Sequence, residues 1–192
     1  MHIKPEIRIL GIDDSALLSD RVMIIGTVFR GGEWIDGILR SEITKDGMDA
    51  TSKIIELVTK SKHYDQIRVI MLDGVTYAGF NVVDVREVYN KTKLPVIVVM
   101  RSLPDFEKIK KALKYLNNFE ERWNTILKAG KIISVVTHPQ TNPIYIQFCG
   151  VSEKDAKKIV QLSSTHSHIP EPIRVAHLIA TGIVLGESTG KA

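Results

Sequence analysis

Two short apolar segments of this sequence each end in an aspartate. Residues 7–12 (IRILGI) precede Asp13, and residues 67–72 (IRVIML) precede Asp73. The second segment is a nearly continuous aliphatic run, which is typical of a strand buried on both faces of a sheet. Carboxylates at the tips of neighbouring strands converge on one point, and a divalent cation is the usual reason for bringing them together. We therefore expect a sheet with an acidic site at one edge.

The order of the other segments predicts an α/β fold. The first three predicted strands are 7–12, 22–30 and 33–43, with a hairpin signal at Gly31-Gly32, which indicates an antiparallel meander. The later predicted strands are 67–72, 95–100, 131–136 and 143–149. The predicted helices are 49–60, 82–90, a long helix 105–128, 153–164 and 171–184.

This order matches a ribonuclease H-like mixed sheet, in which the antiparallel three-strand meander is followed by β-α units and helices cover both faces. A doubly wound nucleotide-binding fold is the alternative. It would place a glycine-rich phosphate loop after the first strand, where this chain has IDDSALLSD. Two acids at that position oppose a phosphate unless a metal ion lies between them.

Composition sets the broad class. The 192 residues suit one domain spanning 1–192, and 44% hydrophobic with 25% charged residues is typical of a globular chain. No apolar stretch approaches the roughly 20 residues that span a bilayer, and the first residues lack a signal-peptide pattern. A single cysteine, Cys149, excludes an internal disulfide. We expect a cytoplasmic protein without membrane contact, whose net charge of +4 permits nucleic-acid binding without requiring it.

The acids suggest a site for Mg²⁺ or Mn²⁺. Asp13 and Asp73 would be direct ligands, because magnesium takes a few carboxylate oxygens and keeps several waters. Asp46 and Asp49 in KDGMDAT lie at another strand-to-helix junction, and either could hold a second ion or the attacking water. Each acid has a structural alternative: Asp13 and Asp73 as turn residues, and Asp49 as a helix cap.

His177 lies one turn inside the helix that PEP opens. Arg174, His177 and Thr181 share one side of that helix, at spacings of three and four residues, opposite the apolar side. A histidine there suits proton transfer or a hydrogen bond to a metal-bound water. Arg174 could bind a phosphate or pair with Glu171, and its position alone does not decide between them.

These segments resemble endonuclease V, the inosine-directed nuclease, and more closely an uncharacterised, mostly archaeal family related to it, domain of unknown function 99. GIDDS and MLDG resemble the strand-end motifs that carry metal-binding aspartates, which places Asp13 and Asp73 on them. LPVIVVMRS resembles the strand leading to a functional lysine, with Arg101 in its place. HIPEPIRVAH is the most specific match and places His177 on an active-site histidine.

The chain departs from endonuclease V at three points. The catalytic glutamate has Asp49 as its best counterpart, with Asp46 as the rival. The aromatic wedge is replaced by EWIDG, where only Trp34 could act on nucleic acid, and the loop after the second aspartate reads DGVTYAGFN. The resemblance therefore implies the fold and the metal site more strongly than it implies inosine specificity.

Together these features predict a metal-dependent nuclease acting on DNA or RNA, with single-stranded and branched strands among its substrates. Asp13, Asp49, Asp73 and His177 would be catalytic, and Arg101, Arg174 and Trp34 would contact nucleic acid. Two alternatives stay open. One is a catalytically inactive nucleic-acid-binding relative, and the other is a phosphate-handling enzyme that acts on nucleotides. The sequence does not decide the oligomeric state.

Overall fold

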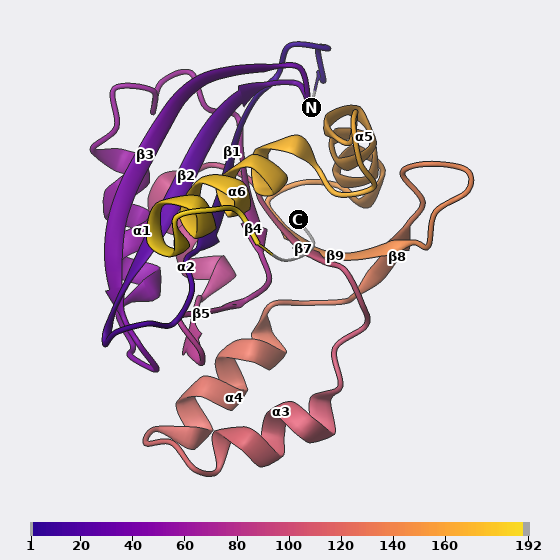
Figure 1. Cartoon of the computed structure of the whole chain (residues 1–192). Helices are drawn as coiled ribbons and strands as arrows, with labels where there is room; N and C mark the ends of the chain where they lie inside the picture. Colours follow the sequence, from indigo (N-terminus) through magenta and orange to yellow (C-terminus); the bar gives the residue numbers. More distant parts are fainter. Residues whose placement is uncertain (1, 190–192) are drawn as a thin grey trace.

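The computed structural model describes residues 2–189 and contains a seven-stranded mixed sheet in the order β3-β2-β1-β4-β7-β9-β8 (Figure 1). The strands of this sheet are β1 Arg8–Asp14, β2 Arg21–Arg30, β3 Trp34–Thr44, β4 Val69–Asp73, β7 Val96–Met100, β8 Ile133–Val135 and β9 Ile144–Cys149. A separate two-stranded hairpin consists of β5 Thr76–Tyr77 and β6 Asn81–Val82. The helices are α1 Ala50–Thr59, α2 Val85–Thr92, α3 Phe106–Leu113, α4 Phe119–Lys128, α5 Glu153–Ser163 and α6 Glu171–Leu185.

The predicted antiparallel meander is confirmed. Strand β2 pairs antiparallel with both β1 and β3, while β1, β4 and β7 run parallel. Parallel strands end at the same edge of a sheet, so the carboxyl ends of β1 and β4 bring Asp13 and Asp73 to one edge. The strands β8 and β9 pair antiparallel, and β9 also pairs antiparallel with β7.

Helices cover both faces of the sheet, as the sequence predicts. Alternate strand residues point to opposite faces. Leu10 and Ile70 pack with α1 and α2 on one face, and Ile9 and Val69 pack with α5 and α6 on the other. Among the described residues no helix is long and apolar enough to cross a membrane.

The prediction of one long helix over 105–128 is wrong. The structure has two helices, α3 and α4, joined by a turn in which Asn118 takes a left-handed conformation with φ 60°. Phe106 and Trp123 meet edge to face across the pair, with ring centroids 6.2 Å apart. The apolar residues keep helical spacing through the turn because both helices contribute to the same small core.

Helix α6 lies directly against β1. A side chain at Gly11 would come within 2.3 Å of the backbone of Pro172, and the hydroxyl of Thr27 donates a 2.6 Å hydrogen bond to the Pro172 carbonyl. Only glycine permits this close approach. The contact fixes where the rest of α6 passes over the carboxyl end of β1.

Candidate active site

Asp13 and His177 form the centre of the site. The Asp13 side chain is buried, with 4% of the residue exposed, and its Oδ2 lies 2.9 Å from Nδ1 of His177. Burial raises the pKa of Asp13 to about 7, against the hydrogen bond from His177, and the charges of Asp73 and Asp14 raise it further. A carboxylate held in this way is poorly stabilised by the protein alone.

The imidazole of His177 faces oxygen atoms on both sides. Its Nδ1 meets Asp13, and its Nε2 lies 3.1 Å from the Thr189 carbonyl. A neutral ring donates one hydrogen bond, whereas the imidazolium donates two. The hydrogen bond with Asp13 accordingly raises the pKa of His177, although partial burial opposes the shift. The pair thus holds an exchangeable proton close to neutral pH.

Asp73 lies at the end of β4 beside this pair and is bound by Arg101. One terminal nitrogen of the Arg101 guanidinium donates to both carboxylate oxygens of Asp73, at 3.0 and 2.8 Å. The Nε atom and the other terminal nitrogen of Arg101 are buried and have no hydrogen-bond partner among residues 2–189. This arginine therefore has unused N–H donors within the site, and a residue that binds a phosphate needs such donors.

Asp14 and Tyr77 also belong to the site, and the sequence did not single them out for it. Asp14 accepts a hydrogen bond from the Ala78 backbone N–H, and burial together with the charge of Asp73 raises the pKa of Asp14. The Tyr77 hydroxyl donates to the Ile12 carbonyl and accepts from the Asp73 N–H, which joins the ends of β1 and β4. The doubled aspartate in GIDDS was the available signal for Asp14, whereas Tyr77 reads as ordinary core.

The two rival third acids, Asp46 and Asp49, are held by neighbouring loops. Asp46 accepts a 2.8 Å hydrogen bond from the Phe80 N–H. Asp49 precedes α1 but makes no side-chain cap. It accepts instead from the N–H and hydroxyl of Thr44 and from the Asn81 amide. These hydrogen bonds lower the pKa of Asp49 although burial opposes the shift. The structural alternative for Asp49, a side-chain cap of α1, is therefore wrong.

Arg122 connects these loops by hydrogen bonds. It is 4% exposed, and its guanidinium donates to the carbonyls of Asp46, Gly47, Phe80 and Asn117. These acceptors lie between β3 and α1, between β5 and β6, and between α3 and α4. Ala78 lies in the loop between β5 and β6, and its N–H donates to Asp14. By holding this loop, Arg122 supports the position of Asp14 at the acid edge.

Arg174 and Trp34 do not join the acid cluster. Arg174 donates to both carboxylate oxygens of the buried Glu171, which is the second of its two expected roles. Trp34 lies opposite Arg30, which in turn faces Arg8, five residues before Asp13 on β1. At about 3.3 Å per residue this is roughly 17 Å along the sheet.

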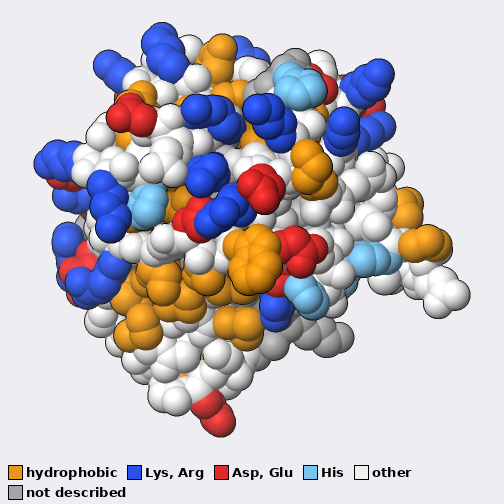
Figure 2. Space-filling view, turned by 90° about the horizontal axis from the view of Figure 1, so that it is seen from above, with side chains coloured by type: hydrophobic (Ala, Val, Ile, Leu, Met, Phe, Trp, Pro, Cys, Tyr) orange, Lys and Arg blue, Asp and Glu red, His pale blue; other side chains and the backbone are white. Residues whose placement is uncertain are grey.

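Figure 2 looks down on the molecule from above the view of Figure 1 and shows apolar, Lys and Arg side chains exposed together.

Carboxylates at this edge fit a divalent cation. Within residues 2–189 no three His, Cys, Asp or Glu side chains are already set at metal-binding positions. Asp13 and Asp73 nevertheless provide two carboxylates that repel one another across a buried edge. A hard cation would relieve that repulsion, and Mg²⁺ needs only one or two carboxylates when waters and phosphate oxygens complete its shell.

A small cavity lies next to the acids. It has a volume of about 140 Å³, and Gly74 and Met100 in its lining adjoin Asp73 and Arg101 in sequence. The other lining residues are mostly apolar: Val75, Thr76, Pro104, Phe106, Ile109, Ile126 and Gln147. The Gln147 amide donates to the Gly130 carbonyl, so its carbonyl oxygen is left for another partner. The cavity is thus an apolar slot with few polar groups, beside the acid edge.

A mixed sheet with this strand order and helices on both faces is the ribonuclease H-like arrangement of endonuclease V. The structure of sea squirt (Ciona intestinalis) endonuclease V in complex with inosine-containing DNA superposes with a TM-score of 0.62 and 16% identity, covering 93% of this chain and 86% of that one. The catalytic domain of human endonuclease V gives 0.60 and 18%, covering 95% and 87%. At these identities the likeness establishes the fold.

Residues 5–184 match the sequence profile of the family described as endonuclease dU, and the chain belongs to this family. A UPF0215 protein of Methanosarcina mazei is 64% identical over 191 residues, covering all of this chain and 97% of the relative. A crystal structure from Archaeoglobus fulgidus, described as a protein of unknown function, is 42% identical with a TM-score of 0.84, covering 92% and 97%. The expected kinship with an archaeal family related to endonuclease V is confirmed.

Proposed function

We propose that this protein is a divalent-metal-dependent endonuclease that cleaves a phosphodiester bond near an altered base in DNA. The observation that carries the proposal is the buried Asp13 beside Asp73, with His177 hydrogen-bonded to it. Asp13 and Asp73 would hold Mg²⁺ or Mn²⁺. When bound, such an ion activates a water and neutralises charge on the phosphate.

The protein's own side chains take the remaining roles. His177 holds a proton at the acid edge and can pass it to or from an oxygen of the scissile group. Arg101 would offer its two unpaired nitrogens to a phosphate oxygen, which a guanidinium fork binds well, once the side chain turns out of its buried position. Tyr77 joins the ends of β1 and β4, Asp14 joins β1 to the turn between β5 and β6, and both act as positioning residues.

The cavity beside Asp73 would receive the base. Enzymes that act at one base in a strand commonly extrude it into a pocket. A volume of about 140 Å³ offers room for one base. The family description includes dU, the usual abbreviation of deoxyuridine. We therefore propose deoxyuridine as the altered nucleotide, with weak or absent preference for inosine.

A panel of end-labelled oligonucleotides tests this proposal. Single-stranded and duplex forms carry deoxyuridine, deoxyinosine, deoxyadenosine or thymidine at one position and are incubated with Mg²⁺, Mn²⁺ or EDTA. We expect cleavage near deoxyuridine with either ion, none in EDTA, and less than a tenfold difference between inosine and adenosine.

Two results would replace the proposal. Binding without cleavage of any oligonucleotide in either ion would indicate the inactive nucleic-acid-binding relative. Hydrolysis of nucleotides, with the oligonucleotides left intact, would indicate the phosphate-handling alternative.

A further inference from the structure

The α3–α4 pair projects from the sheet as a separate arm (Figure 1). Strand β7 runs parallel to β4 and ends at the same edge of the sheet. Helix α3 begins at Phe106, only five residues after Arg101, so the arm starts near the acid edge. One side of the arm packs inward around Phe106, Ile109 and Trp123. The other side is exposed to solvent, so the arm continues outward from the acid edge.

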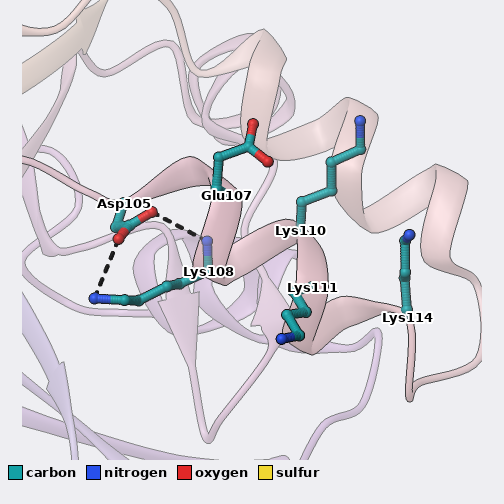
Figure 3. Close-up of a pocket in the computed structure, with 6 residues that line it drawn as sticks. All are labelled: Asp105, Glu107, Lys108, Lys110, Lys111 and Lys114. Atoms are coloured by element: carbon teal, nitrogen blue, oxygen red, sulfur yellow. Dashed lines mark hydrogen bonds and ion pairs between the residues drawn. The ribbon is translucent and has the colours of Figure 1, made fainter.

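The exposed side of α3 is strongly basic. Residues 108–114 contain four lysines, Lys108, Lys110, Lys111 and Lys114, and no acid. These side chains, with Asp105 and Glu107, line an open hollow of about 630 Å³ (Figure 3). Lys108 pairs with Asp105 at 3.2 Å and Lys110 lies over the Trp123 ring, whereas Lys111 and Lys114 form no ion pair within the described chain.

Exposed faces of two other helices of this protein carry acids that form ion pairs with their lysines. On α1, Glu56 pairs with both Lys53 and Lys60, and on α5, Glu153 pairs with Lys157. Acids spaced three or four residues from lysines balance the charge of an exposed helix. On α3, Glu107 lies three and four residues before Lys110 and Lys111 but forms no ion pair with either among the described residues, so the charges of Lys111 and Lys114 stay available to an anion.

We infer that the exposed face of α3 binds the sugar-phosphate backbone of the nucleic-acid strand beside the cleavage site. This inference rests on the proposed function. From Lys108 to Lys114 the helix rises about 9 Å, the length of roughly three nucleotides at 3.4 Å each. Tyr115, 84% exposed at the end of α3, adds a ring on which a base can stack.

The test removes two charges from α3 and compares the loss with a matched change elsewhere. One variant carries Lys111→Gln and Lys114→Gln. The control carries Lys154→Gln and Lys158→Gln on α5, which also lie exposed on one helix and change the net charge equally. A third variant carries Lys111→Arg and Lys114→Arg. Thermal melts establish that each protein is folded.

Binding of a labelled single-stranded oligonucleotide is measured by fluorescence anisotropy in EDTA between 50 and 200 mM salt. Each phosphate contact on a single strand contributes about 0.7 to the slope of log K against log salt. We expect the α3 glutamine variant to bind at least threefold more weakly, with a slope smaller by about 1.4. The α5 control and the α3 arginine variant should match wild type.

Because binding is read without metal, its outcome is separate from that of cleavage. Equal slopes for the α3 and α5 variants, in a protein that cleaves, would overturn the inference and leave the proposed function standing. A loss specific to α3, in a protein that cleaves nothing, would support the inference and refute the nuclease proposal. If the wild type binds no oligonucleotide in EDTA, the inference fails, and the proposed function fails with it only if no oligonucleotide is cleaved with Mg²⁺ or Mn²⁺.

Discussion

Nδ1 of His177 lies 2.9 Å from Oδ2 of Asp13, although 164 residues separate them in the chain. The contact follows from the docking of Pro172 on Gly11. From Pro172 to His177 the helix rises about 7.5 Å, and from Gly11 to Asp13 the strand advances about 6.6 Å. The two spacings match, so the motifs GIDDS and PEPIRVAH meet at Asp13 and His177.

This pair makes the stability of the metal-free protein depend on pH. The pKa of Asp13 is about 7 in the folded state against 3.8 for the free side chain, and the pKa of His177 is also raised. Both groups hold a proton more tightly when folded, so their stabilising contribution is complete at low pH and is lost as pH rises through about 7. We expect the free energy of unfolding to fall between pH 5 and 8 by on the order of 2–3 kcal/mol.

Denaturant titrations in EDTA measure this change. Asp13→Asn removes the carboxyl titration and should flatten the profile, while Mg²⁺ added at pH 8 should restore stability only in the wild type. Parallel profiles for the two proteins would show that Asp13 does not titrate in this range.

Arg101 competes with a cation for Asp73. In the structure its guanidinium is bound to both Asp73 oxygens. Arg101→Gln should therefore strengthen Mn²⁺ binding by several fold while it slows cleavage, because a phosphate loses its partner. Isothermal titration measures the first effect, and single-turnover cleavage measures the second. Weaker metal binding in the variant would mean that Arg101 helps to hold Asp73 in its binding position.

Asp49→Asn is expected to destabilise the protein. An asparagine would cap a helix as well as aspartate does, but Asp49 binds Thr44 and Asn81 instead. Its carbonyl oxygen can still accept from the Thr44 N–H and the Asn81 amide, but its NH2 group then faces the Thr44 hydroxyl, and the negative charge of the acceptor is lost, at a cost of about 1 kcal/mol. Thermal melts of Asp49→Asn and Asp46→Asn decide this. An unchanged melting temperature for Asp49→Asn, together with lost cleavage, would restore Asp49 as the third catalytic acid.

Arg122→Met tests the support of the loops around the acid edge. Removing the guanidinium leaves four carbonyls without their donor. A buried acceptor left unpaired costs about 1–3 kcal/mol. Because these four carbonyls are only partly buried and water can reach some of them, we expect a total loss on the order of 3 kcal/mol. Arg86→Gln, which removes one exposed hydrogen bond to the Lys128 carbonyl, is the control. A loss no larger than that of the control would contradict this role.

The sequence predicted those features that depend on local patterns. The apolar runs before Asp13 and Asp73 placed both acids at one edge, and helical spacing placed His177 on the polar side of α6. Other features depend on contacts between distant segments. Arg122 reads as a surface residue of an amphipathic helix, and its partners lie 42 to 76 residues away, apart from Asn117. The break at Asn117-Asn118 carries asparagine, which can mark a helix end as glycine does, but the apolar spacing that continues through it favoured one long helix.

The most direct test of the central claim is single-turnover cleavage of a deoxyuridine oligonucleotide across a Mg²⁺ titration. Asp13→Asn and Asp73→Asn are compared with Asp65→Asn, an exposed aspartate that precedes the start of β4. We predict that the first two lose at least a thousandfold in rate, about 4 kcal/mol in the barrier, while Asp65→Asn cleaves like wild type. Magnesium-dependent cleavage that survives in both Asp13→Asn and Asp73→Asn would contradict the claim that these carboxylates hold the ion.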